Sequence, residues 1–247
     1  LNAHKINAGE LITLDNKNKD FFFFEKKDVR SVMGALVYLV KTRLPEYIGA
    51  SPFEIQVLTP MRKGELGVEH LNEVLQYYLN PASESKKEKE GRTGVFREGD
   101  KVMQVKNNYK LEWKITNAKG FSIEEGLGVF NGDMGIIKQI NTYSERITVV
   151  FDENREAEYP FSSLDELELA YAITIHKSQG SEYPAVVLPL LSGPPILCNR
   201  NLLYTAITRA QKCVAIAGRQ SMVEQMIHNE TEQKRYSGLN DCLKEGL

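Results

Sequence analysis

The residues best suited to chemistry lie in three short stretches of the chain, and the first is the richest. Residues 170–183 read Ala-Tyr-Ala-Ile-Thr-Ile-His-Lys-Ser-Gln-Gly-Ser-Glu-Tyr and include Thr174, His176, Lys177 and Ser178. Small hydroxyls, exposed backbone and a neighbouring lysine can hydrogen-bond phosphates, as positioning contacts to DNA commonly do. The pattern predicts a short helix over 171–179 with Gly180 at its C-cap. Taken alone, His176 is more often a packed or solvent-facing histidine and Ser178 a surface residue.

The second stretch places an arginine at the end of a predicted helix. Residues 201–210 read Asn-Leu-Leu-Tyr-Thr-Ala-Ile-Thr-Arg-Ala, and the apolar run Cys213–Ala217 follows as a predicted strand. A guanidinium held rigidly at such a corner suits an arginine finger, which stabilises charge on a transferring phosphoryl group. Taken alone, Arg209 is more often a surface salt-bridge partner.

The third stretch is Val-Leu-Thr-Pro-Met-Arg-Lys-Gly at residues 57–64, with Arg62 in the loop after a predicted buried strand. Ligands bind outside the carboxyl ends of the strands in open α/β sheets. We therefore expect Arg62 and Arg209 to lie in loops that face one cleft.

Helices and buried strands alternate around these stretches. Asp28 is placed to cap a helix whose apolar positions run from Val29 to Val40 at helical spacing. Pro45 and Gly49 are expected to end this helix. A helix between two buried strands indicates a parallel α/β sheet. The other elements expected here are a strand at Phe21–Glu25, a strand at Phe53–Thr59, a turn at Pro60–Gly67, a helix at Val68–Leu79 and strands at Leu167–Ala170 and Ala185–Leu190.

The middle of the chain has a different texture. Residues 81–94 are polar and highly charged, which is typical of a solvated linker. Short alternating strands follow at Asp100–Val105, Gly135–Ile140 and Arg146–Phe151, as in small all-β barrels. The fold class expected is therefore α/β, with residues 1–80 and 165–247 forming one discontinuous domain. Residues 81–164 form the inserted linker and barrel.

Bulk composition excludes several classes of protein. The net charge of −2 means that any nucleic-acid surface is a local patch. The three cysteines (Cys198, Cys213, Cys242) have no pairing pattern, and the four histidines have no metal-ligand spacing, so we expect no disulfide framework and no metal site. The sequence contains no apolar run long enough to cross a membrane, and a cytoplasmic location fits best.

In this order, the three stretches resemble motifs IV, V and VI of superfamily 1 helicases. The resemblance is most specific at Thr174–Glu182 and Tyr204–Ala210, and it is closest to the RecD/TraA group of 5′-to-3′ DNA helicases, near the exodeoxyribonuclease V alpha subunit. Residues 99–104 and 131–135 resemble the SH3-like barrel that this group inserts between motifs IV and V, and residues 2–7 resemble the entry to its second motor domain. The resemblance implies a RecA-like parallel sheet with an inserted SH3-like barrel.

The resemblance also implies roles for individual residues. Arg62 and Arg209 would face the γ-phosphate of ATP, and Gly180 and Glu182 would lie beside the nucleotide. Single-stranded DNA would meet Thr174, His176, Lys177 and Ser178. The sequence contains no Gly-x-x-x-x-Gly-Lys-[Ser/Thr] phosphate loop. Since the chain also opens on Leu1, we expect it to be part of a longer helicase whose N-terminal motor domain holds ATP and Mg²⁺, and to be inactive alone. Other recombination or repair subunits are possible partners.

One misleading motif and two alternative functions have to be weighed against this interpretation. Residues 147–153 look like an apolar strand that ends in the magnesium-binding acidic pair of an ATPase, but a hairpin at Asp152-Glu153-Asn154 fits better. The first alternative function is a non-catalytic single-stranded DNA-binding module. The second is a protein-interaction module built on the barrel. Aromatic and cationic residues in the barrel favour nucleic acid over protein there, with Trp113 equally suited to the barrel core. These residues are Lys101, Lys106, Tyr109, Lys110, Trp113, Lys114 and Lys119.

Overall fold

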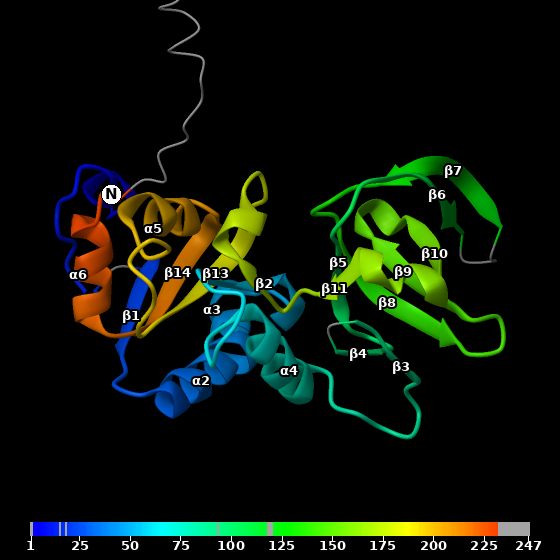
Figure 1. Ribbon diagram of the computed structural model, residues 1–247, viewed down its shortest axis with the longest axis horizontal. Helices are drawn as coiled ribbons and strands as arrows, with labels where there is room; N and C mark the ends of the chain where they lie inside the picture. Colours follow the sequence, from blue (N-terminus) through cyan, green and yellow to red (C-terminus); the bar gives the residue numbers. More distant parts are fainter. Residues whose placement is uncertain (1, 15, 18, 93, 118–120, 232–247) are drawn as a thin grey trace, which may run out of the picture.

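A computed structural model describes residues 2–14, 16–17, 19–92, 94–117 and 121–231 of the chain (Figure 1). Two sheets organise it. One is a five-stranded sheet of order β1-β14-β13-β2-β12, and the other a seven-stranded sheet of order β11-β5-β8-β9-β10-β6-β7. A two-stranded pair, β3-β4, lies beside the antiparallel sheet, below β8 and β11 in the view of Figure 1. The expected class, an α/β unit with an all-β insertion, is confirmed.

Every strand pair in the five-stranded sheet is parallel. Its strands are nearly continuous apolar runs, as expected for strands that are covered on both faces. Side chains of β14 alternate between two cores, with Ala215 facing one and Ile216 the other. The strands are β1 (Phe21–Glu25), β2 (Ile55–Thr59), β12 (Ala172–Thr174), β13 (Tyr183–Leu190) and β14 (Ala210–Gly218).

Helices cover both faces of this sheet. Leu36 of α2 and Leu71 of α4 pack in one core with Val57, whereas Leu203 of α5 and Met226 of α6 pack in the other. The helical elements are α1 (Asn2–Asn7), α2 (Val29–Tyr38), η1 (Leu39–Arg43), α3 (Leu44–Ile48), η2 (Pro52–Glu54), α4 (Val68–Leu79), α5 (Arg200–Ile207) and α6 (Gln220–His228).

The helix that begins after Asp28 runs further than expected. Asp28 is its N-cap and accepts a hydrogen bond from the backbone N–H of Ser31, as predicted. Pro45 does not end it, because a π-helical turn at Leu39–Arg43 intervenes and leaves Pro45 in the first turn of α3. A proline is tolerated in a first turn, where its missing N–H costs no hydrogen bond. Gly49, with a φ of +67°, ends the run as predicted.

The seven-stranded sheet is antiparallel throughout. The expected strands β5, β8 and β9 are confirmed to within a residue or two, whereas β6, β7 and β10 were not individually predicted. The hairpin predicted at Asp152-Glu153-Asn154 is confirmed, because Asp152–Asn154 connects the antiparallel pair β9 and β10. The elements are β5 (Lys101–Gln104), β6 (Asn108–Thr116), β7 (Ser122–Val129), β8 (Met134–Asn141), β9 (Arg146–Phe151), η3 (Asp152–Asn154), β10 (Glu156–Pro160), η4 (Phe161–Glu166) and β11 (Leu167–Leu169).

The chain changes sheet over very few residues. Strand β11 pairs with β5 of the antiparallel sheet, so Leu167–Leu169 is not a strand of the parallel sheet. The charged stretch before the barrel is more structured than a linker, because β3 (Glu88–Glu90) pairs with β4 (Val95–Arg97). The division into residues 1–80 with 165–247 and residues 81–164 stays a prediction.

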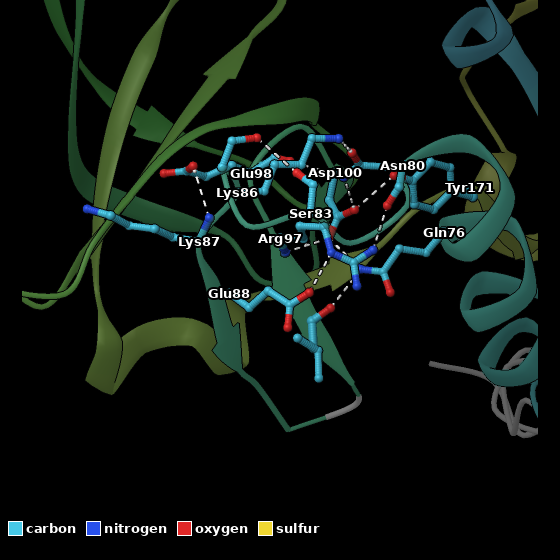
Figure 2. A network of polar contacts seen from close by, with 12 residues as sticks. Gln76, Asn80, Ser83, Lys86, Lys87, Glu88, Arg97, Glu98, Asp100 and Tyr171 are labelled. Carbon is cyan, nitrogen blue, oxygen red and sulfur yellow. Dashed lines mark hydrogen bonds and ion pairs between the residues drawn. The ribbon is translucent and has the colours of Figure 1, made fainter.

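A buried polar network holds α4 against the start of the barrel (Figure 2). Asp100 is fully buried and accepts four hydrogen bonds. The donors are Gln76 Nε2 at 2.6 Å, Arg97 N at 2.6 Å, Asn80 Nδ2 at 2.7 Å and Tyr171 Oη at 2.9 Å. Burial raises the pKa of Asp100, although each of these donors lowers it. The network therefore joins α4, β4 and the segment that enters β12.

Candidate functional site

The stretch 170–183 does not form the expected helix. Ala172–Thr174 is strand β12, which pairs with Val57–Thr59 of β2, and Ile175–Ser178 is a short 3₁₀ turn, η5. The β-branched run Ile173-Thr174-Ile175 favours a strand, and pairing with β2 completes the edge of the sheet. Thr174 caps the turn, since its Oγ1 accepts a hydrogen bond from the Lys177 N–H at 3.3 Å.

This geometry separates the four side chains that were expected to meet DNA. His176 is exposed, and Thr174 and Lys177 are half-buried. Ser178 is fully buried and donates to the Ile175 carbonyl oxygen at 2.7 Å. Because the segment is a 3₁₀ turn, Thr174 and Ser178 do not share a helix face. Of the four, His176, Thr174 and Lys177 have side chains with access to solvent.

Arg209 lies at the corner between α5 and β14, as predicted. Its guanidinium is half-buried and donates to the carbonyl oxygens of Thr205 at 3.3 Å and Ser181 at 3.2 Å. The corner is closed by a backbone bond from the Tyr183 N–H to the Arg209 carbonyl at 2.8 Å. Two segments far apart in the sequence are thereby held together, and the arginine is fixed at several points.

Gly180 and Glu182 belong to the same corner. Gly180 has a φ of +87°, and a Cβ built there would meet nothing within 4 Å, so its backbone is open to a ligand. Glu182 is exposed and accepts a hydrogen bond from Gln211 Nε2 at 3.2 Å. The fold therefore gathers Arg209, Gly180 and Glu182 at the amino ends of β13 and β14. Gln211, which carries no motif signal, joins them.

Arg62 lies elsewhere. It follows the carboxyl end of β2 and forms ion pairs with Glu168 at 2.7 Å and Glu69 at 3.5 Å. Lys177 pairs with the same Glu168 carboxylate at 3.0 Å. Burial raises the pKa of Glu168, but the hydrogen bonds from Arg62 and Lys177 outweigh it and hold the pKa below the usual value. The Glu168 hydrogen bond in turn raises the pKa of Arg62.

The register of the parallel sheet shows that Arg62 and Arg209 lie near opposite ends of its strands. Val57 of β2 is level with Val187, which is level with Ala215 of β14. Arg62 follows β2 at the carboxyl end, whereas Arg209 precedes β14 at the amino end. A rise of 3.3 Å per residue puts about 20 Å of strand between the two ends. The described contacts join Arg62 to Glu168 and, through this carboxylate, to Lys177, and none of them joins Arg62 to Arg209.

Side chains of the barrel differ in their access to solvent. Lys101 is buried, donates to Phe53 O at 2.7 Å and Gln56 Oε1 at 2.8 Å, and is therefore not available to nucleic acid. Burial lowers the pKa of Lys101 to about 8. Lys106 forms an ion pair with Asp165. Lys110 and Lys114 are exposed, and Lys119 lies outside the described residues.

The two aromatic side chains of the barrel considered for nucleic acid, Trp113 and Tyr109, both pack against neighbouring residues. Trp113 is half-buried, its ring lies over Gly126, and the Arg155 guanidinium lies 5.6 Å from the ring centroid. Tyr109, 68% exposed, packs edge-on against Phe130 at 5.5 Å between centroids. A hollow of about 610 Å³ beside Trp113 lies on the barrel, away from the Arg209 corner.

Within the described residues, the structure has neither a metal-binding group nor a membrane-spanning helix. No group of three or more His, Cys, Asp or Glu side chains there is arranged to hold a metal ion. No helix among those residues is long and apolar enough to span a membrane. Cys198 and Cys213 are buried free thiols, and burial raises the pKa of Cys213 to about 11. Cys242 lies outside the described residues.

Comparison with known proteins supports the sequence resemblance. The model for the SH3 domain of ATP-dependent RecD-like DNA helicases matches residues 71–151, and the model for the UvrD-like helicase C-terminal domain matches residues 169–217. The ATP-dependent RecD2 DNA helicase of Deinococcus radiodurans is 39% identical over 68% of this chain, and the match covers 20% of that protein. The RecBCD enzyme subunit RecD of Mycolicibacterium smegmatis is 30% identical over 77% of the chain, and the match covers 29% of that protein.

Solved structures similar to this chain include Bacteroides Pif1 bound to single-stranded DNA, with a TM-score of 0.45 and 15% sequence identity. The match covers 87% of this chain and 53% of that one. The resemblance to superfamily 1 DNA helicases of the RecD type is thus confirmed by the family models and the sequence relatives. The chain spans less than a third of the length of the two curated relatives named above.

Proposed function

We propose that this chain, which is similar to RecD-type DNA helicases, is the part of an ATP-dependent 5′-to-3′ helicase that completes the ATP site and carries some of the single-stranded DNA. One observation supports this above the others. Arg209, Gly180 and Glu182 come from two motifs and meet at one corner, held by the Arg209–Ser181 hydrogen bond at 3.2 Å. Each alone has an ordinary structural explanation, but the three together form a cation, an open backbone and a carboxylate in one place.

The chemistry proposed for this corner is electrostatic. ATP, when bound, supplies the phosphoryl group that is transferred to water, with charge spread over the phosphoryl oxygens. Arg209 would turn its guanidinium from the Ser181 carbonyl to those oxygens, and Glu182 would accept a hydrogen bond from the ribose beside Gly180. The phosphate loop and the Mg²⁺ ligands would come from another motor domain of the same polypeptide. We infer that this chain by itself lacks ATPase activity.

Single-stranded DNA is proposed to pass over the loop between β12 and β13. The exposed imidazole of His176 and the half-buried hydroxyl of Thr174 are its candidate contacts. Ser178 contributes instead by closing the 3₁₀ turn, since its hydroxyl is bonded internally. Such contacts are mostly to phosphates, so the binding would have little sequence preference.

The DNA assignment is testable on this chain alone. Fluorescence anisotropy with a labelled oligothymidylate should show weak binding whose log affinity falls with log salt by about 0.7 per phosphate contacted. His176→Ala and Thr174→Val should each weaken it. His70→Ala is the matched control, because His70 is also exposed and lies on α4 beside Glu73. Equal effects of the two histidine variants, or tight binding indifferent to salt, would overturn the assignment.

The ATP assignment needs a second assay. Phosphate release should stay at background for this chain with saturating single-stranded DNA. Turnover that disappears in an Arg209→Ala variant of the same chain would mean that a complete ATP site exists within these residues. The proposal that the other half of the site lies in another domain would then be wrong.

A further inference from the structure

Two cations that the motifs assign to different ligands share one carboxylate in this fold. Arg62 follows β2, Lys177 lies in η5 after β12, and β2 and β12 are neighbours in the sheet. The carboxylate of Glu168, in β11, accepts hydrogen bonds from Arg62 Nη2 at 2.7 Å, from Arg62 Nη1 at 3.5 Å and from Lys177 Nζ at 3.0 Å. A planar guanidinium and an ammonium that converge on one pair of oxygens form the kind of donor set that also binds a phosphate.

The access of these side chains suits exchange of the bound anion. The side chains of Arg62 and Lys177 are 44% and 31% exposed, whereas that of Glu168 is 17% exposed. A phosphate arriving from solvent can therefore reach both cations without opening the core. Glu69 is the second carboxylate paired with Arg62, at 3.5 Å from Nε, whereas Glu168 accepts from the terminal nitrogens Nη1 and Nη2.

We propose that Arg62 and Lys177 form one phosphate-binding site, and that Glu168 occupies this site as an internal anion until a phosphate displaces it. The proposal deepens the function proposed above and rests on it for the identity of the ligand. The phosphate is either a phosphodiester of single-stranded DNA or a phosphate of the nucleotide. In both cases the carboxylate competes with the ligand for the same donors.

The position of Glu168 gives this competition a structural consequence. Strand β11 pairs with β5 of the antiparallel sheet, while both cations lie on loops of the parallel sheet. Displacement of Glu168 by phosphate would release one of the contacts that tie the barrel to the parallel sheet. Phosphate binding and the freedom of the barrel are therefore coupled through one side chain.

The test uses this chain and the variant Glu168→Gln, which keeps the shape of the side chain and removes its charge. The matched control is Glu230→Gln, because Glu230 also pairs with an arginine, Arg200, at 2.8 Å on the parallel-sheet side of the molecule. One arm measures oligothymidylate binding by anisotropy, and the other measures inorganic triphosphate binding by calorimetry. Thermal melting of each variant verifies that it is folded.

Glu168→Gln should tighten binding of one or both probes by about two- to fivefold, the effect of releasing a partly exposed ion pair. If the ligand is DNA, the salt dependence should also steepen by about 0.7 because one more phosphate is contacted. A response to oligothymidylate alone identifies a phosphodiester, and a response to triphosphate alone identifies the nucleotide. If neither probe responds beyond the Glu230→Gln control, or if binding weakens, the competition does not exist.

A double-mutant cycle separates competition from a general charge effect. Lys177→Gln should cost little in the wild-type background, where the lysine is held by Glu168, and several-fold more in the Glu168→Gln background. Equal losses in both backgrounds would refute the shared site. If wild-type protein ignores oligothymidylate but Glu168→Gln still tightens triphosphate, the DNA assignment fails and the phosphate site stands.

Discussion

The Asp100 network offers the sharpest test of how the barrel is attached. In the variant Asp100→Asn, an NH₂ group, which donates hydrogen bonds, replaces one of the two carboxylate oxygens. Each of these oxygens accepts two hydrogen bonds in the wild-type protein. If the amide nitrogen takes the place of Oδ2, it faces the backbone N–H of Arg97, which cannot rotate away. If it takes the place of Oδ1, it faces Asn80 Nδ2, whose own amide also donates to the Glu98 carbonyl oxygen at 3.1 Å. Either orientation leaves at least one buried donor unpaired.

The unpaired donors determine how much stability the Asp100→Asn variant loses. An unpaired buried donor destabilises a fold by about 1–3 kcal/mol. Loss of the negative charge also weakens the two hydrogen bonds that the remaining oxygen accepts, so we expect Asp100→Asn to lower the free energy of unfolding by about 2–4 kcal/mol in total. For a chain of this size, that corresponds to a fall in Tm on the order of 10 °C.

Urea unfolding followed with two probes will measure this effect. Trp113 is the only tryptophan and lies in β6, so its fluorescence reports the barrel, whereas far-UV circular dichroism reports the whole chain. In wild-type protein the two transitions should coincide. In Asp100→Asn they should separate, because the junction between barrel and parallel sheet has lost its central acceptor.

The control is Asp165→Asn, which removes an exposed carboxylate that lies outside the network and is paired with Lys106. It should leave both transitions where they are in wild-type protein. If Asp100→Asn behaves like Asp165→Asn, the four hydrogen bonds do not hold the two sheets together.

Four substitutions at other sites have further expected outcomes. Burial lowers the pKa of Lys101 from 10.5 to about 8, so the unfolded chain binds more protons between those values and stability should rise with pH there. Relative to Lys101→Met, the wild-type free energy of unfolding should gain on the order of 2 kcal/mol between about pH 7.5 and 9.5, and parallel pH profiles would refute this. Gly34→Ala in α2 should stabilise by about 0.5–1 kcal/mol, because its Cβ meets nothing within 4 Å. Gly126→Ala should destabilise by about 1–3 kcal/mol, because its Cβ would lie 2.3 Å from the Trp113 ring. Thermal melting tests both glycine variants: Tm should rise for Gly34→Ala and fall for Gly126→Ala. In the whole protein, Arg209→Ala should lower ATP turnover roughly a thousandfold and spare DNA affinity without nucleotide, and loss of DNA binding with intact turnover would invert the assignment.

Much of the parallel sheet was predictable from local patterns. The strand at Phe21–Glu25, the cap at Asp28 and the helix at Val68–Leu79 appear where the residues predict them. These elements are long or strongly apolar, and local propensity agrees with burial in each. The motif around Arg209 was equally clear, because a helix followed by an apolar strand fixes an arginine at the corner between them.

Local patterns failed where the partner strand decides the structure. Residues 171–179 have helical spacing, but β2 offers an edge that Ala172–Thr174 completes, so the segment is a strand followed by a 3₁₀ turn. Leu167–Leu169 is a strand in either interpretation, and only its pairing with β5 assigns it to the antiparallel sheet. Long-range pairing of this kind leaves no periodic signal in the strand itself.

The sequence by itself determined which side chains we propose for the chemistry, because motif residues are specified by type and spacing. Only the tertiary structure decided which of them meet. It brought Arg209 to Ser181 and Gln211 to Glu182, and it brought Arg62 to Lys177 through Glu168, a residue with no motif signal. The physical reason is that parallel strands have two ends. Whether a loop leaves from the carboxyl end or enters at the amino end depends on strand order and register, which are properties of the whole sheet.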